Sequence, residues 1–148
     1  MSLEKRIESE FKAALKERDK TKVSTLRMLK SEMNYSLLGQ DKKGLSEDDI
    51  VMIVQRQVKQ HKDSISLFEK GNRGDLVEKE KRELDILLTY LPKQISCEEL
   101  TKIINETIAE VGATTKKDMG KVIKAVLEKV KGATEGKKVS QIVSGLLA

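Results

Sequence analysis

Apolar residues recur every three or four positions along most of this chain, and short polar or glycine-containing segments interrupt the pattern. This spacing is typical of amphipathic α-helices, in which positions i, i+3, i+4 and i+7 lie on one face. The first two stripes are Leu3, Ile7, Phe11, Ala14 and Leu15, then Val23, Leu26, Leu29, Met33 and Leu37. We expect these two helices to form a hairpin.

Two further helices with the same periodicity are predicted between Ser46 and Leu91. Their inward positions are Ile50, Ile53, Val54, Val58, His61, Ile65 and Phe68, then Leu76, Leu84, Leu87, Leu88 and Leu91. Glu80 interrupts the fourth stripe, so we expect its carboxylate to be either partly solvated or paired.

Residues that cap helices precede all four segments. A cap side chain accepts a hydrogen bond from an N–H group of the first turn. The predicted caps are Ser2, Asp19, Ser46 and Asp75. Ser46 with Asp49 resembles a capping box in which aspartate replaces the usual glutamate or glutamine.

Polar and glycine-rich segments predict where these helices end. Gly39 and the polar run 40–44 should end the second helix, and the turn 71–74 should end the third. Proline pushes the residue before it out of the helical region, and the only proline is Pro92. The fourth helix should therefore end by Leu91.

Residues 92–95 form the predicted boundary between two helical units. Ser96 and Glu99 then have the spacing of a full capping box, which predicts a helix over Cys97 to Val111, ended by Gly112. Its apolar residues are Leu100, Ile103, Ile104, Ile108 and Val111.

Two more helices complete the second unit. Thr115 with Asp118 should start the first of them, and Gly132 should end it in the left-handed conformation that glycine adopts without steric cost. Gly136 opens the last helix. The two stripes are Met119, Val122, Ile123, Val126, Leu127 and Val130, then Val139, Ile142, Val143, Leu146 and Leu147.

The predicted fold is all-α, with an N-terminal four-helix domain over residues 1–91, a linker over 92–95 and a C-terminal three-helix bundle over 96–148. The composition agrees, because 36% of the 148 residues are charged and only 3% are aromatic. Such a profile argues against a β-sandwich or barrel. It also argues against a base-stacking platform for single-stranded nucleic acid.

The net charge of +5 is concentrated in one part of the chain. The stretch from Thr115 to Ala148 has eight lysines against three acidic residues, and the positive and negative charges of the remaining residues cancel. At about 100° per residue, Lys117, Lys121, Lys124 and Lys131 fall opposite the apolar stripe of their helix. Two interpretations stay open, namely a solvated helix surface and a surface for an anionic partner.

The chain has no catalytic constellation that its residues would identify. His61 is the only histidine and lies within an apolar stripe, which is typical of a residue at the edge of a core. Cys97 lies in a first helical turn, where the helix dipole favours a thiolate, but the one histidine lies 36 positions upstream, which disfavours a Cys–His couple. Glu80 and Glu83 are close carboxylates of a kind that arises by chance in such a charged chain. No HExxH, Walker loop, GxGxxG or GxSxG motif is present, so we expect no metal and no cofactor.

The compartment is predicted from two further observations. A single cysteine allows neither an internal disulfide nor a cysteine-based zinc site. The start of the chain alternates charged and apolar residues, unlike a signal peptide, and no window approaches the roughly 20 apolar residues of a membrane span. We therefore expect a cytosolic protein with no membrane partner.

Several motifs resemble the GatB/YqeY family, and the resemblance covers nearly the whole chain. They are the run 71–76, the pair Glu80 and Glu83, the run 90–92, the run 118–122, Lys131-Gly132 and Gly136-Lys137. Where the family usually has aspartate before the last glycine, this chain has Glu135.

The resemblance implies an N-terminal helical part followed by a three-helix part similar to the tail of the B subunit of the tRNA-dependent amidotransferase. That tail is the portion associated with the tRNA body. The chain is thus expected to bind tRNA or another structured RNA. An alternative is an adaptor for an amidotransferase, a synthetase or ribosomal proteins. A third hypothesis is an accessory subunit in a carbon–nitrogen ligase that uses glutamine as amido donor, active only within a complex.

Carried over to this sequence, the resemblance implies an RNA-facing set of lysines. These are Lys117, Lys121, Lys124, Lys131, Lys137 and Lys138. Gly120, Gly132 and Gly136 are expected at packing or turn positions, with Gly120 allowing either a neighbouring helix or a ligand backbone to come close. Arg73 and Asp75 are expected to hold the turn between the third and fourth helices.

Overall fold

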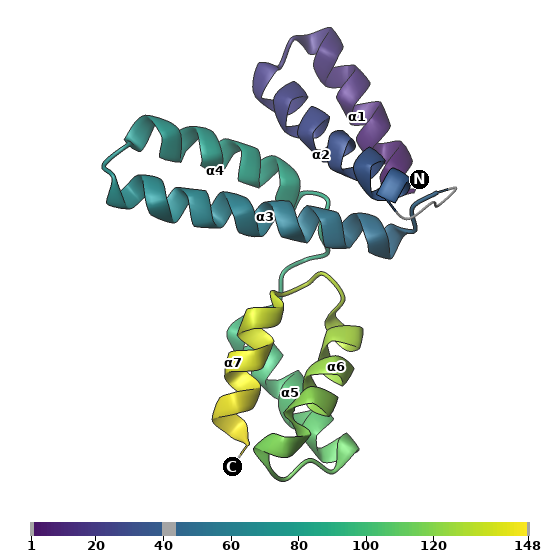
Figure 1. Ribbon diagram of the computed structural model, residues 1–148, viewed down its shortest axis with the longest axis vertical. Helices are drawn as coiled ribbons and strands as arrows, with labels where there is room; N and C mark the ends of the chain where they lie inside the picture. Colours follow the sequence, from purple (N-terminus) through teal and green to yellow (C-terminus); the bar gives the residue numbers. More distant parts are fainter. Residues whose placement is uncertain (1, 40–43, 148) are drawn as a thin grey trace. The chain divides into compact units, whose positions relative to one another are not determined.

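The computed structural model describes residues 2–39 and 44–147. Within these ranges the chain forms seven α-helices and one 3-10 turn, with no β-strand, so the all-α prediction is confirmed. The chain folds into two compact units, Met1–Leu91 and Pro92–Ala148 (Figure 1).

The first unit contains two helical hairpins, α1–α2 and α3–α4 (Figure 1). The helices are α1 (Leu3–Glu17), α2 (Lys20–Gly39), α3 (Glu47–Lys70) and α4 (Gly74–Leu88). The predicted caps of the first three are confirmed, because Ser2, Asp19 and Ser46 each accept a hydrogen bond from a first-turn N–H group. Ser46 and Asp49 form the reciprocal capping box.

One expectation about the helix ends is wrong, and another falls partly on residues outside the described ranges. Asp75 does not cap α4, because the helix already begins at Gly74 and Asp75 lies inside its first turn. Residues 40–43 of the polar run after α2 are outside the described residues. In the turn between α3 and α4, the left-handed position is taken by Asn72, with φ of 56°.

The core of the first unit comes from all four helices and the segment after α4. Its buried residues are Ile7, Leu26, Leu29, Met33, Ile50, Ile53, Val54, Val58, Leu87 and Tyr90. Leu15 is expected to face inward but is 46% exposed, whereas the adjacent Ala14 is 1% exposed.

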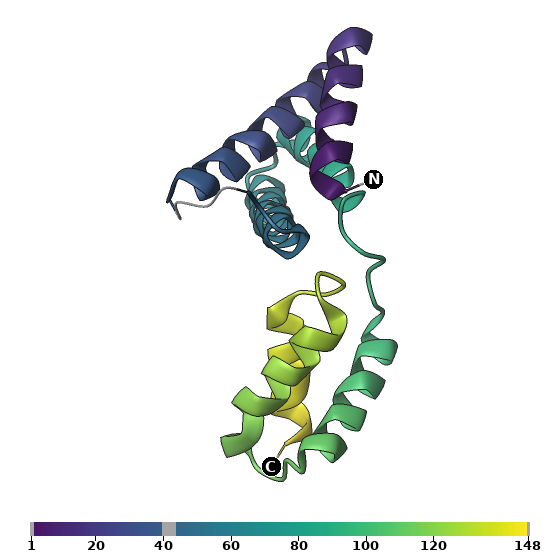
Figure 2. The same cartoon turned by 90° about the vertical axis from the view of Figure 1, so that its right-hand side faces the viewer.

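The second unit is a bundle of α5 (Cys97–Val111), α6 (Met119–Val130) and α7 (Gly136–Leu146), drawn in green to yellow in Figure 2. The predicted bounds of α5 are confirmed, and Gly112 and Gly132 have left-handed φ values of 68° and 76°. The buried core residues of this bundle are Leu100, Ile104, Val122, Val126, Val130, Ala133, Val139, Val143 and Leu147.

Two details of the second unit differ from a simple three-helix pattern. A 3-10 turn, η1 (Lys116–Asp118), precedes α6, so Lys117 lies before the regular helix. The segment 92–95 is bound to the α6–α7 loop: the Ile95 N–H donates to the Ala133 carbonyl at 2.9 Å, and Gln94 Nε2 donates to the Gly132 carbonyl at 3.0 Å.

None of the helices in the described ranges has the length and apolar character needed to cross a bilayer.

Candidate nucleic-acid interface

The six lysines of the predicted RNA-facing set are all exposed, and they fall into two groups along the chain. Lys117 lies on η1, and Lys121 and Lys124 lie in the first half of α6. Lys131 lies in the loop after α6, and Lys137 and Lys138 begin α7. The structure therefore places one group at the start of α6 and the other at its end. We call these six residues the lysine set.

The lysine set has few acidic partners inside the protein. Among the described residues, Lys117, Lys121, Lys124, Lys137 and Lys138 form no ion pair. Lys129, which is not in the set, shows the contrast. Its Nζ lies 2.7 Å from Glu110 Oε2 and donates to Thr107 Oγ1 at 3.0 Å. Its charge is thus neutralised within the bundle, while those five ammonium groups face solvent.

Three acidic residues lie near the lysine set, and one of them is Glu135 in the loop between Lys131 and Lys137. Asp118 accepts a hydrogen bond from the Thr114 N–H at 3.2 Å and so closes the turn before α6. Glu128 is exposed and follows Lys124 by one helical turn, on the lysine side of α6. An anion approaching this side of the helix would meet Glu128 as its main source of repulsion.

Gly120 lies beside Lys121 in the first turn of α6. A Cβ atom at this position would meet nothing within 4 Å. The expected close approach of a neighbouring helix is therefore wrong for helices of this chain. The close approach of a ligand backbone stays a prediction.

Gly132 and Gly136 bound the loop that carries Lys131. Gly132 is buried and left-handed, which allows the sharp exit from α6. Gly136 is exposed and begins α7. Glu135 stands at the N-cap position of α7, yet its side chain makes no cap hydrogen bond. The longer glutamate arm is a poorer cap than aspartate.

Arg73 and Asp75 hold the α3–α4 turn together, as expected. Arg73 Nη2 lies 3.2 Å from Asp75 Oδ2, with both side chains exposed. The hydrogen bond from Arg73 lowers the pKa of the Asp75 carboxyl, and the same bond raises the pKa of Arg73. The pair lies in the first unit and forms no part of the lysine set.

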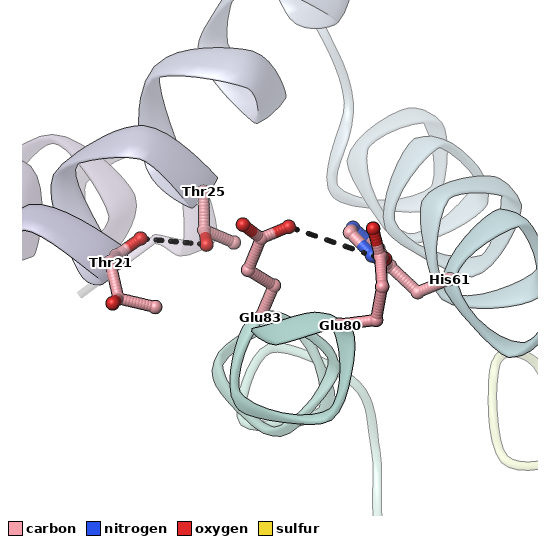
Figure 3. Close-up of polar contacts among 5 residues, drawn as sticks. All are labelled: Thr21, Thr25, His61, Glu80 and Glu83. Atoms are coloured by element: carbon pink, nitrogen blue, oxygen red, sulfur yellow. Dashed lines mark hydrogen bonds and ion pairs between the residues drawn. The ribbon is translucent and has the colours of Figure 1, made fainter. Parts of the chain in front are cut away.

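The structure also assembles a cluster that the sequence analysis did not predict. Packing of α3 against α4 brings His61 together with Glu80 and Glu83 (Figure 3). His61 Nδ1 contacts Glu80 Oε2 and lies 3.7 Å from Glu83 Oε2. Glu80 is therefore paired, which confirms one of the two outcomes expected for it. His61 is 9% exposed and Glu83 is 8% exposed.

A signal for this cluster existed in the sequence. If α3 and α4 form an antiparallel hairpin about the turn 71–74, positions equally far from the turn lie opposite each other. His61 and Glu83 are nearly equidistant from it, and Glu80 lies one turn from Glu83 on the same helix. Periodicity within single helices does not reveal such a pairing.

Comparison with known proteins gives one family and several relatives. A family model described as Yqey-like protein matches residues 4–147. A protein of Vanderwaltozyma polyspora named altered inheritance of mitochondria protein 41, mitochondrial, is 32% identical over 93% of this chain and 78% of its own length. A protein of Pyrenophora tritici-repentis with the same name is 28% identical over 93% and 79%. An uncharacterised protein of Schizosaccharomyces pombe is 32% identical over 56% and 67%.

The cytosolic location predicted from the sequence is contradicted by these relatives, because two of the three are named as mitochondrial proteins. The prediction depended on the alternating charged and apolar start of the chain. That pattern bears on secretory export and on membrane spanning, and it does not distinguish the cytosol from the mitochondrion.

Proposed function

The chain belongs to the Yqey-like protein family, and from this premise we propose that it is a non-catalytic module that binds tRNA through the phosphates of the RNA. Contact is made by the lysine set of the second unit. Preference for one RNA over another comes from the shape of the RNA backbone.

The observation that carries the proposal is the difference between Lys129 and the lysine set. The bundle neutralises Lys129 with Glu110, whereas five lysines of the set have no ion pair among the described residues. Exposed ammonium groups attract phosphates and release counterions when they bind. The lysines occupy both ends of α6, a helix of 12 residues that is about 18 Å long. One backbone path along the bundle could meet both groups.

Gly120 adds support from shape. It lies between Lys117 and Lys121 with open space where its Cβ would be. A phosphate or ribose can approach the α6 backbone closely at this point. The second unit contains no aromatic residue, so base stacking makes no contribution.

Salt-dependent binding tests the proposal. Fluorescence anisotropy with labelled tRNA, between about 50 and 200 mM salt, should give a steep fall in affinity. A Lys117→Ala, Lys121→Ala, Lys124→Ala variant should bind more weakly and reduce the slope of log K against log salt by roughly 2 to 3.

The matched control removes three lysines from the first unit. Lys5, Lys12 and Lys16 are exposed on α1 and form no ion pair among the described residues. Their replacement by alanine lowers the net charge equally and should leave most of the affinity. Equal weakening by the two triple variants would reject a specific lysine face and leave only general attraction by net charge.

A second candidate function is an adaptor that docks on an amidotransferase, a synthetase or a ribosomal protein in glutamine-dependent amidation of misacylated tRNA. Exposed apolar side chains of the first unit favour it. Tyr35 and Leu38 on α2 are 79% and 83% exposed, and Met52 on α3 is 61% exposed. Isolated apolar side chains are common on surfaces, but these three lie on two adjacent helices.

The adaptor is tested by co-purification after nuclease treatment. Recovery of one of those three partner classes from the native cell, and its loss in a Leu38→Asp, Met52→Asp variant, would support it. Loss of every partner on nuclease treatment would favour RNA binding alone.

A further inference from the structure

The buried cluster of His61, Glu80 and Glu83 in the first unit has the composition of a metal site. We propose that these three side chains bind a divalent transition-metal cation, with Zn²⁺ as the best match. The proposal concerns α3 and α4 and is independent of RNA binding by the second unit.

The donor atoms are close enough for one ion. A nitrogen of His61 and one carboxylate oxygen from each glutamate lie within 4.8 Å of one another. Around a tetrahedral Zn²⁺ with bonds of about 2.0–2.1 Å, donor atoms are separated by roughly 3.3 Å. His61 Nδ1 and Glu83 Oε2 are 3.7 Å apart, so small side-chain rotations bring the three donors to that spacing.

Glu83 is the more buried of the two carboxylates, with its side chain 11% exposed against 19% for Glu80. Its side chain points toward His61 (Figure 3), and the residue is only 8% exposed. Its carboxylate accepts no hydrogen bond from any described residue, and its only partner is His61 at 3.7 Å. Thr25 lies next to it, but the Thr25 hydroxyl donates to the Thr21 carbonyl at 2.8 Å. A bound cation would give this largely buried carboxylate a close partner in place of its long contact with His61.

Charge and access also fit a cation. Two carboxylates and one neutral imidazole give the site a charge that a divalent ion cancels. The cluster lines a pocket of about 310 Å³ whose lining also includes Ser24 and Ser64, so water can fill a fourth coordination position. Lys79 also lines the pocket, yet it forms no ion pair among the described residues.

The donor set decides which metals are suitable. One imidazole with two carboxylates and no thiolate suits Zn²⁺, Mn²⁺ or Fe²⁺ and disfavours Cu⁺. The competing arrangement is a set of contacts between His61 and the two carboxylates that binds no metal.

The single histidine makes a direct test possible. In the ¹⁵N-labelled full chain, the imidazole resonances belong to His61 alone. Addition of Zn²⁺ should shift the Nδ1 resonance saturably at one equivalent and raise the melting temperature. Mn²⁺ should broaden the His61 resonances before others. Unchanged His61 resonances at a tenfold excess of Zn²⁺ would overturn the proposal.

Variants separate the cluster from surface carboxylates. Glu83→Gln keeps the shape of the side chain and should weaken Zn²⁺ by roughly tenfold or more, since even partners outside the coordination shell cost 10–100-fold. Glu78→Gln is the matched control, because Glu78 lies on the same helix with its side chain 77% exposed. Equal Zn²⁺ affinity in the two variants would overturn the proposal. The lysine set is untouched, so tRNA binding should persist in both variants.

Discussion

At the scale of single residues, Tyr90 shows how a motif side chain is used for packing. It follows α4, is 3% exposed and contributes to the core of the first unit. The Arg6 guanidinium lies 4.9 Å from the ring centroid. Burial first, and then the neighbouring Glu10 carboxylate, raise the pKa of the Tyr90 phenol well above its usual value.

The raised pKa predicts a loss of stability in alkali. The folded chain holds the phenolic proton more tightly than the unfolded chain does, so the contribution is complete below about pH 10 and falls as the pH rises further. Urea unfolding of the wild type and of Tyr90→Phe at pH 9 and pH 11 measures it. The wild type should lose more stability than Tyr90→Phe between these values. Tyr35→Phe, at a position 79% exposed, is the control and should behave as the wild type does.

Glu135 gives a second prediction at this scale. It stands at the N-cap of α7 without a cap hydrogen bond. Glu135→Asp places a shorter carboxylate where it can accept from the first turn, and should stabilise the chain by roughly 0.5–1 kcal/mol. Glu135→Gln is the control and should show no such gain. Chemical denaturation that finds the aspartate variant no more stable than the wild type would contradict the assigned cap position.

At the scale of elements, α6 combines an apolar side, a basic side and a glycine in its first turn. Its Val122, Val126 and Val130 are buried, as the periodicity predicted. Gly120 adds no contact to this packing, since the space beside it is open. Helix stability alone would therefore favour alanine at this position.

Gly120→Ala separates stability from binding. The substitution should stabilise the chain by about 0.5 kcal/mol, because alanine is the better helix former. If an RNA backbone approaches here, tRNA affinity should fall nonetheless, by about threefold to tenfold. Gly145→Ala in α7 is the matched control, since its Cβ also meets nothing within 4 Å. It should give a similar gain in stability with unchanged affinity, and parallel behaviour of the two variants would argue against close approach at Gly120.

The helices could be predicted from periodicity and capping residues within each segment. The wrong or missing predictions concern an exact cap position and contacts between helices. Periodicity and caps predicted α5 to the residue, because Ser96 and Gly112 mark both of its ends. Asp75 was misassigned because a capping residue type was taken for a capping position. The pairing of His61 with Glu80 was missed because it depends on how α3 packs on α4, which no single-helix pattern contains.

At the scale of the whole molecule, the two units have separate cores. Every aromatic residue of the chain lies in the first unit, and the stretch 115–148 of the second unit carries the whole excess of positive charge. The sequence marked the change between the units through Pro92, and it did not reveal that residues 94 and 95 are hydrogen-bonded to the loop after α6.

Those hydrogen bonds predict the behaviour of isolated fragments. Residues 92–148 should fold alone, because this unit contains its own core, and should bind tRNA with most of the affinity of the full chain. A fragment over 96–148 lacks the Ile95 N–H donor to Ala133 and should be less stable by about 1 kcal/mol or more. Circular dichroism during thermal unfolding compares the two. An unfolded 92–148 fragment would show that the second unit depends on the first.

The second unit, which carries the lysine set, has no aromatic side chain, and this restricts which features of an RNA it can recognise. A surface that offers only flexible ammonium groups and one bare stretch of helix can follow the contour of a folded strand, but it cannot distinguish one nucleobase from another by stacking. Base changes that preserve the path of the sugar–phosphate chain should thus leave the affinity for the RNA unchanged. Unfolding the RNA without changing its sequence should abolish the preference of the protein for that RNA.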